Sequence, residues 1–354
     1  MAYTDIDKPS DYFNTKLYTG NGSTQSITGI NFQSDMVWTK ARSGTYGTQD
    51  HAIIDVVRGV TKTIRPNKTT AEGTETNTIT SFDTDGYTIG GDNGKFNQSS
   101  TEYVSWNWLA DNTSGSSNTD GSITSTVSAN TTSGFSIVTY SGTGSNATVG
   151  HGLGVTPDMV IVKDRTNNVG STNWNVYHSA NTSAPETEII TLNGTGATSD
   201  SNIYWNDTAP TSSVFSLGTA GQVNYSSDDY VAYCFTSIKG FSKFGSYTGN
   251  GNADGTFTYL GFKPAFVIIK QTNAAGENWF ICDNKREGYN AENNRLIPNL
   301  STAEQSDSPI DILSNGFKAR ETGAKVNASG STYIYMAFAE NPLVGTNNIP
   351  ATAR

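Results

Sequence analysis

The chain repeats one short pattern three times, and this repeat constrains the fold more than any other feature of the sequence. Each copy has an apolar residue, a turn pair and a short apolar or β-branched run that ends in a lysine, at 32–40, 155–163 and 262–270. A Tyr-Thr/Ser-Gly-x-Gly turn precedes each copy, and its tyrosine lies 22, 23 and 23 residues before the closing lysine. Spacing this regular through otherwise different sequence predicts a tandem array of structural units.

Each predicted unit closes with a strand in which bulky and mixed side chains alternate. Successive side chains of a strand point to opposite faces, so the bulky residues share one face. We expect that face to lie in the core of a β-sandwich. The bulky residues are Val104, Trp106 and Trp108; Val231, Tyr233 and Phe235; and Ile334, Met336 and Phe338. An Asn-x-Ser triplet begins six residues before the first tyrosine of each closing strand, at Asn97, Asn224 and Asn327.

The composition fits short strands joined by turns. Only 34% of residues are hydrophobic and 15% are charged, yet 11% are aromatic. Aromatic and β-branched residues suit pleated surfaces, while Gly, Asn, Asp and Ser supply turn conformations. The predicted fold class is therefore all-β, with three tandem antiparallel β-sandwich units of the jelly-roll or lectin-like kind.

The repeat also predicts where the units begin and end. Residues 111–133 are rich in Gly, Ser and Thr, which predicts an extended and mobile linker. Units two and three have no such spacer, so we expect them to pack directly against each other. The predicted segments are an N-terminal arm (1–12), unit 1 (13–110), the linker (111–133), unit 2 (134–239), unit 3 (240–340) and a C-terminal tail (341–354).

Charge and cysteine content exclude several classes of function. A net charge of −10 argues against a nucleic-acid partner, which requires clustered Lys and Arg. No apolar run is long enough for membrane insertion. Two cysteines in different units make no disulfide framework, and Cys234 is expected to be a small buried filler. The N-terminal sequence shows no secretory signal, which favours synthesis and folding in a cytoplasm.

No pattern in the sequence indicates catalysis. The three histidines have no serine or cysteine partner in a recognisable nucleophile motif, so we expect no catalytic residues and no enzyme activity. The Asp-Gly turns around 83–86 and 92–94 are typical of structural turns. A cation site there is the alternative, although they lack the ligand spacing of a calcium loop. We therefore predict no metal and no cofactor.

Charged residues recur at equivalent places in the units. Lys40, Lys163 and Lys270 end their strands and are expected to be solvated charges that protect a sheet edge. Asp and Arg lie three residues apart after the middle strand, at 55–58 and 283–286, and are expected to pair and fix the loop. Ligand binding by Arg286 at the loop tip is the alternative.

Candidate ligand-binding residues are few. Trp174 and Trp279 are expected to be core residues. Trp205 follows a tyrosine in a polar loop region, so it is harder to place in a core and is the best candidate for a stacking residue. Asn206, Arg286 and Tyr289 are weaker candidates.

Several of these motifs together resemble a known repeat domain. The stretches 240–251, 283–286, 314–318 and 333–342 resemble a domain found in virion proteins of marine tailed bacteriophages, usually labelled tail-fibre-like or structural. The resemblance covers units 2 and 3 well and unit 1 more loosely, because His51 stands where tryptophan is usual. The strand order that it implies is similar to concanavalin or laminin-G-like sandwiches.

The resemblance implies a non-enzymatic structural protein of a virion. Such a protein would be made in the host cytoplasm and assembled onto the phage particle, with other virion proteins of the capsid or tail as partners. We expect a fibre-type or spike-type adhesin, as a homotrimer, that binds a host-surface glycan or envelope protein. The alternative is an architectural decoration or cementing protein of capsid or tail with no host ligand.

Overall fold

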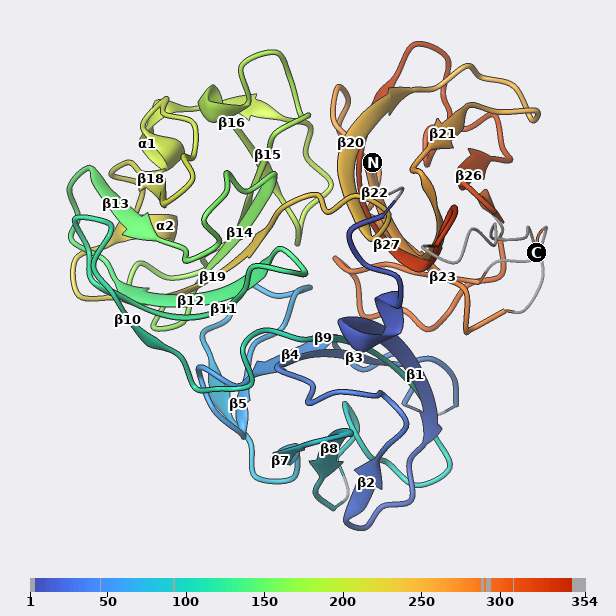
Figure 1. The fold of residues 1–354 in the computed structure, drawn as a ribbon, viewed down its shortest axis with the longest axis horizontal. Coiled ribbons are helices and arrows are strands. Elements are labelled where there is room, and N and C mark those ends of the chain that lie inside the picture. Colours follow the sequence, from blue (N-terminus) through green and yellow to red (C-terminus); the bar gives the residue numbers. More distant parts are fainter. Residues whose placement is uncertain are drawn as a thin grey trace.

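Three groups of β-strands surround a common centre in the computed structural model of the chain (Figure 1). All strand pairs in its sheets are antiparallel, so the all-β prediction is confirmed. We call the groups unit 1 (β1–β9), unit 2 (β10–β19) and unit 3 (β20–β27). The structure describes residues 4–44, 46–91, 93–287, 290, 294–307 and 309–345.

The elements are short, as the turn-rich composition predicts. Unit 1 is preceded by a 3-10 turn, η1 (Pro9–Asp11), and contains β1 (Phe13–Thr19), β2 (Gln25–Ile27), β3 (Met36–Ala41), β4 (Ala52–Asp55), β5 (Lys62–Thr63), β6 (Gly73–Thr74), β7 (Ile79–Asp83), β8 (Gly86–Ile89) and β9 (Glu102–Trp108). Unit 2 contains β10 (Ser116–Asn118), β11 (Ser125–Asn130), β12 (Phe135–Ser141), β13 (Ala147–Gly150), β14 (Met159–Asp164), β15 (Trp174–His178), η2 (Pro185–Thr187), β16 (Glu188–Thr191), β17 (Ser199–Asp200), α1 (Asn202–Trp205), β18 (Val214–Leu217), α2 (Gly221–Asn224) and β19 (Asp229–Phe235). Unit 3 contains β20 (Ser242–Thr248), β21 (Phe257–Tyr259), β22 (Phe262–Gln271), β23 (Phe280–Asp283), β24 (Arg295–Leu296), β25 (Ile310–Leu313), β26 (Gly316–Ala319) and β27 (Thr332–Pro342).

The main sheet has the same central strand order in every unit. The orders are β1-β9-β3-β4, β12-β19-β14-β15 and β20-β27-β22-β23. In each, the closing strand lies between the opening strand and the lysine-ended strand. A smaller sheet accompanies each of them, with orders β2-β8-β7, β13-β18 and β21-β26-β25. The sequence repeat is thus a repeat of strand topology.

The segment predicted as a mobile linker is instead part of a sheet. It contains β10 and β11, and β11 pairs with β12, so that Val127 lies opposite Val138. Val127 is buried, whereas β10 is exposed at the edge of the eight-stranded sheet. Polar edge strands share their Ser/Thr-rich composition with flexible linkers, and this explains why the prediction was wrong.

The recurring tyrosines stack in pairs across the opening and closing strands. Their ring planes are nearly parallel, and the hydroxyls of the opening tyrosines donate to backbone carbonyls of the turn that precedes the closing strand. The pairs are Tyr18 with Tyr103 (ring centroids 5.1 Å apart), Tyr140 with Tyr230 (5.1 Å) and Tyr247 with Tyr333 (5.0 Å).

The recurring asparagine ties the opening turn to the closing one. In unit 2 the Asn224 Nδ2 donates to the carbonyls of Ser145 (2.6 Å) and Gly218 (2.9 Å), and its Oδ1 accepts from the Thr143 amide (2.8 Å). The equivalent bonds are made by Asn97 and Asn327. Backbone groups of two turns are thereby satisfied by one buried side chain.

The glycines of the Tyr-x-Gly-x-Gly turn are required by this close approach. A Cβ on Gly142 would lie 2.2 Å from the Tyr225 carbonyl oxygen. Gly144 has φ +74°, a left-handed conformation that other residues rarely adopt. The repeated motifs therefore hold the backbone of the opening turn against the turn that precedes the closing strand.

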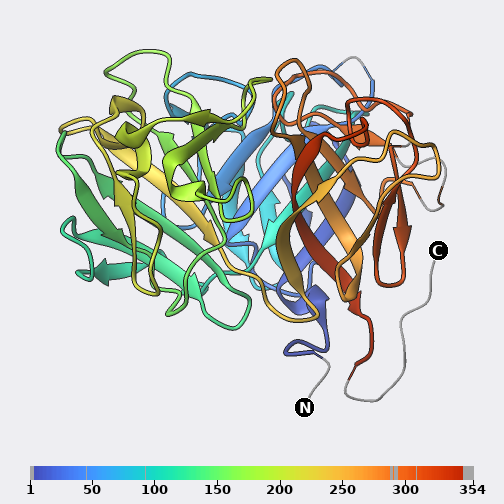
Figure 2. The same cartoon turned by 90° about the horizontal axis from the view of Figure 1, so that it is seen from above.

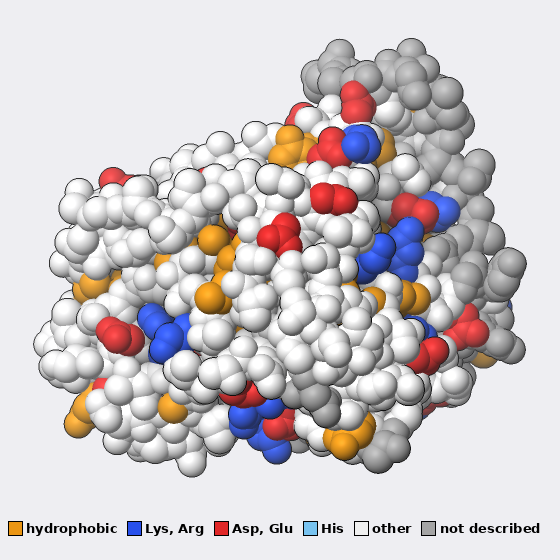
Figure 3. Space-filling model, turned by 90° about the horizontal axis from the view of Figure 1, so that it is seen from below, with side chains coloured by type: hydrophobic (Ala, Val, Ile, Leu, Met, Phe, Trp, Pro, Cys, Tyr) orange, Lys and Arg blue, Asp and Glu red, His pale blue; other side chains and the backbone are white. Residues whose placement is uncertain are grey.

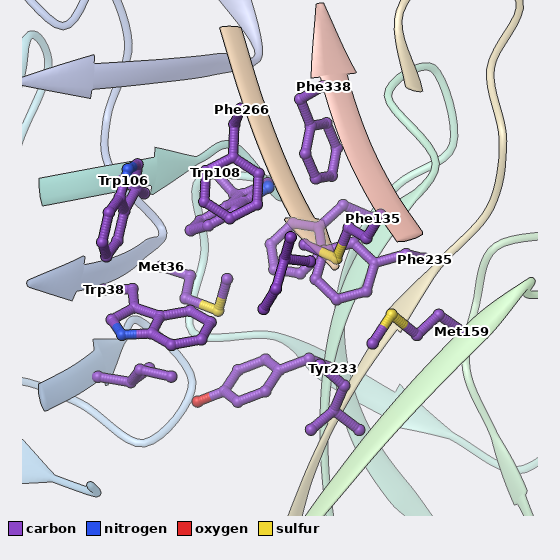
Figure 4. Close-up of a cluster of buried hydrophobic side chains, with 14 of the residues drawn as sticks. Met36, Trp38, Trp106, Trp108, Phe135, Met159, Tyr233, Phe235, Phe266 and Phe338 are labelled. Carbon is purple, nitrogen blue, oxygen red and sulfur yellow. The ribbon is translucent and has the colours of Figure 1, made fainter. Parts of the chain in front are cut away.

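The bulky faces of the three closing strands meet at the centre of the molecule. Their side chains form one buried cluster shared by all units, with Trp106, Phe235 and Phe338 among its members (Figure 4). The Phe266 ring of unit 3 lies 5.7 Å from Trp106 of unit 1. The prediction that this face fills the core of a single sandwich is therefore wrong. In units 2 and 3 it is the opposite face of the closing strand, including Cys234, that packs in the unit's own core.

Hydrogen bonds from equivalent aromatic residues close the three units into a ring. Each residue begins or precedes the middle strand and donates a ring N–H to a backbone carbonyl of the neighbouring unit. The donors and acceptors are His51 Nε2 and Ile297 (3.0 Å), Trp174 Nε1 and Arg65 (2.9 Å), and Trp279 Nε1 and Thr191 (2.8 Å). In this order, the bonds run from unit 1 to unit 3, from unit 2 to unit 1 and from unit 3 to unit 2.

His51 makes the same kind of contact between units as Trp174 and Trp279 make from units 2 and 3. Its Nδ1 accepts a hydrogen bond from Trp38 Nε1 (3.0 Å), which assigns the proton to Nε2. The looser match of unit 1 to the repeat thus preserves the contact between units.

The N-terminal arm packs against the ring. Ile6 is buried in the central cluster, and the Asp5 amide donates to the Lys239 carbonyl (3.0 Å). The arm and the end of β27 lie at the same end of the molecule (Figure 2).

Candidate functional site

The recurring Asp–Arg pairs are structural. Arg286 Nε donates to Asp283 Oδ2 (2.5 Å), and Arg58 pairs with Asp55 in the same way (2.6 Å). Arg286 also binds Glu304 (3.1 Å), and its side chain is fully buried. The predicted pairing is confirmed, and the position of Arg286 offers no exposed loop tip for a ligand.

The recurring lysines are buried. Lys40 Nζ donates to the carbonyls of Ala41 (2.7 Å) and Gly47 (2.5 Å). Burial lowers the pKa of Lys40 to about 7 and that of Lys163 and Lys270 to about 8. The prediction of solvated charges is wrong, because these ammonium groups satisfy backbone carbonyls from inside the structure.

Trp205 lies in the core of unit 2. Only 2% of it is exposed, its ring is 6.2 Å from that of Tyr177 in an edge-on contact, and its Nε1 donates to the Glu188 carbonyl (3.0 Å). The interpretation that its polar surroundings keep it out of a core is contradicted, since the short helix α1 turns the ring inward. Asn206 follows in a left-handed conformation (φ 55°) and is exposed, and its Oδ1 accepts from Asn146.

The structure does not gather the predicted ligand-binding residues into one site. Tyr289 lies outside the described residues. Of the other three, only Asn206 reaches the surface, and Arg286 belongs to a different unit.

The histidines and Asp85 have structural partners, whereas Asp92 lies outside the described residues. Burial lowers the pKa values of His51, His151 and His178, and each ring accepts or donates a hydrogen bond. Asp85 accepts from the amides of Gly29 and Asn31, which explains its Asp-Gly turn. Within the described ranges, no three His, Cys, Asp or Glu side chains group to hold a metal ion. The described helices include none with the length and hydrophobicity to cross a membrane.

An exposed pair of aromatic residues marks a different surface, on unit 3. Phe257 and Tyr259 are 44% and 52% exposed, whereas Thr258 between them is buried. The two rings therefore share the outer face of β21, which is the edge strand of its three-stranded sheet. Neither residue was among those predicted from the sequence to bind a ligand. The alternation Phe-Thr-Tyr in a polar stretch indicates such a pair, but the same alternation is also found in strands whose aromatic residues face a core.

A cavity of about 500 Å³ opens next to Tyr259. The connection between units 2 and 3 lines one side of it, and Leu260 and Phe244 contribute an apolar surface. Lys239 and Lys243 also line it. Lys243 Nζ donates to the Tyr259 carbonyl (2.7 Å) and lies 5.6 Å from the centre of that ring. Apolar walls with a few polar groups are typical of ligand pockets.

The exposed large hydrophobic residues are unevenly distributed among the three units. The large hydrophobic residues that are exposed in the described chain belong to units 2 and 3, and none lies in unit 1. The face in Figure 3, on the side of unit 1, accordingly shows mostly uncharged polar side chains and backbone.

Comparison with known proteins identifies the family but no activity. No curated protein matches the chain. The chain belongs to the family described as a domain of unknown function, DUF7483, whose sequence pattern matches residues 8–342, from just before η1 to the end of β27 and thus through all three units.

Proposed function

We propose that this chain is a non-enzymatic structural protein of a tailed-phage virion, displayed on the particle surface as an adhesin for a host-surface glycan or envelope protein. The motif resemblance in units 2 and 3 supports the virion setting. The exposed aromatic pair next to a cavity supports adhesion, because aromatic rings that are rigidly held on a surface provide large contact area for a ligand.

We propose further that each unit is a β-sandwich of the jelly-roll or lectin-like kind. The pairing of a larger and a smaller sheet in each unit supports this assignment. A rigid β-framework with many exposed loops suits recognition at loop and edge positions. The net charge of −10 keeps particles apart, so the molecule as a whole does not attract an acidic envelope and adhesion would depend on local contacts.

An architectural decoration protein is the second candidate. The closed ring in Figure 1 favours it, since three units packed around one centre make a compact body instead of an elongated fibre. The expected homotrimer remains a prediction. The bulky faces are already buried within one chain, so further copies would have to associate through outer faces or the ends of the ring.

Two measurements on the full-length chain test these proposals. Antibody labelling of purified virions in the electron microscope should place the protein on the particle surface. Fluorescently labelled protein should bind host cells saturably, and Tyr259→Ala should weaken that binding while Tyr225→Ala, at a similarly exposed tyrosine in unit 2, should not. Labelled virions without cell binding would favour decoration. Unlabelled virions would refute both candidates.

A further inference from the structure

We propose that the cavity beside Tyr259 binds an acidic polysaccharide, with the Tyr259 ring against a sugar and the Lys243 ammonium group near a carboxylate. This inference rests on the proposed adhesin function and names the chemical class of its ligand.

The charge of the cavity differs from that of the molecule. The chain has 32 acidic and 22 basic residues, yet the described residues that line the cavity include Lys239 and Lys243 and no Asp or Glu. Lys263 lies in the next strand but is paired with Glu340 (3.1 Å), and neither lines the cavity. A lysine in a cavity whose described lining has no acidic side chain, as Lys243 is, attracts an anion to that position.

Lys243 is held in place for such a contact. Its hydrogen bond to the Tyr259 carbonyl uses one of the three donors of an ammonium group. The same bond keeps the charge beside the exposed ring. A ligand that stacks on Tyr259 would therefore bring its own charged group within reach of Lys243.

The apolar surfaces favour a sugar over a simple ion. Phe244 and Leu260 line the cavity, and a small anion gains little from such walls because it loses hydration there. The faces of sugar rings carry C–H groups that pack on aromatic and aliphatic side chains.

The second aromatic ring favours a ligand with several rings. Phe257 lies two residues before Tyr259 on the same face of β21, and a strand advances about 7 Å over two residues. A polymer that crosses both rings would place one sugar on each and a carboxylate near Lys243.

Calorimetric titration of the full-length protein tests the proposal. The probes are polygalacturonate, an acidic polysaccharide, with neutral dextran and inorganic phosphate as comparisons. We expect saturable binding of polygalacturonate that weakens as salt is raised, and at least tenfold weaker binding of dextran and phosphate.

Variants locate the binding. Tyr259→Ala and Lys243→Gln should each weaken polygalacturonate binding by at least tenfold, whereas Tyr225→Ala in unit 2 and Lys68→Gln in unit 1, which alter a tyrosine and a lysine outside the cavity, should change it less than twofold. Lys243→Gln keeps Tyr259 intact and so tests the charge even if Tyr259→Ala folds poorly. Absence of polygalacturonate binding, or equal binding of dextran, would refute the inference. Host-cell binding that survives Lys243→Gln would refute it too while leaving adhesion intact.

Discussion

Asn224 shows that the asparagine that recurs in every unit has a structural role. It is fully buried, and its single amide bonds three backbone groups from two turns. The stacked tyrosines Tyr140 and Tyr230 pack beside the same turns and direct their hydroxyls to other backbone carbonyls. The most regular motifs of the sequence thus belong to the framework.

Asn224→Ala should reduce the free energy of unfolding by about 3 kcal/mol, because it removes three hydrogen bonds that a fully buried side chain makes to the backbone of both turns. Asn202→Ala, at an exposed position of α1, should change it by less than about 0.5 kcal/mol. Urea denaturation followed by circular dichroism measures both. Equal effects of the two substitutions would contradict the role of Asn224.

The three contacts between units use equivalent positions of the chain, but the side chains at these positions differ. Two contacts carry a bidentate ion pair between neighbouring units, Arg42 with Glu304 and Arg165 with Glu72. In the third, the equivalent backbone contact is made by Thr198, whose amide donates to the Thr272 carbonyl (2.8 Å). The contact between units 2 and 3 lacks the ion pair that the other two have at this position.

The contact between units 2 and 3 differs from the other two contacts at a second position. Asp283 accepts from Trp106 Nε1 (3.0 Å) and Asp55 from the Tyr233 hydroxyl (2.7 Å). The third closing strand has Met336 at this position, which offers no donor. His178 stands in place of the aspartate and avoids a buried carboxylate without a partner.

His178 itself packs tightly between units 2 and 3. It is 1% exposed, its Nε2 donates to the Tyr335 carbonyl (3.1 Å), and its Nδ1 accepts from the Ala180 amide (3.2 Å). Protonation of Nδ1 would remove this acceptor and bury a charge.

Acid should therefore weaken this contact. Burial lowers the pKa of His178 to about 4, below the value of about 6.5 of an exposed histidine. The unfolded chain takes up the proton first, so stability is lost as pH falls from about 6.5 to about 4, by up to about 3 kcal/mol. His178→Gln does not titrate, and its stability should fall less over this range in urea denaturation. Parallel pH profiles for the two proteins would contradict this role of His178.

At the scale of the whole molecule, the three units share their largest hydrophobic cluster. Phe266 of unit 3 packs against Trp106 and Trp108 of unit 1 and against Phe338 of its own unit. Each unit alone would expose the bulky face of its closing strand.

Phe266→Ala should therefore destabilise all three units together, by about 3–5 kcal/mol. The expected result is one thermal transition at lower temperature, with tryptophan fluorescence and far-ultraviolet circular dichroism changing together. Scanning calorimetry supplies the measurement. A separate early transition of unit 3 would show that the units unfold independently.

The candidate surface on unit 3 could not be found from the sequence. Phe257 and Tyr259 have the alternation of a strand, but alternation alone does not say which face meets solvent. Trp205 shows the converse, since a polar neighbourhood in the sequence did not prevent its burial in the core of unit 2.

The sequence by itself determined the all-β class, the threefold repeat and the Asp–Arg pairs, because these depend on neighbouring residues and on regular spacing. Only the tertiary structure decided that the bulky faces meet at one centre, that Lys40 and its counterparts are buried, and that residues 111–133 extend a sheet. A strand pattern separates two faces but does not identify what covers each of them. That choice depends on contacts between residues hundreds of positions apart, such as Trp106 with Asp283.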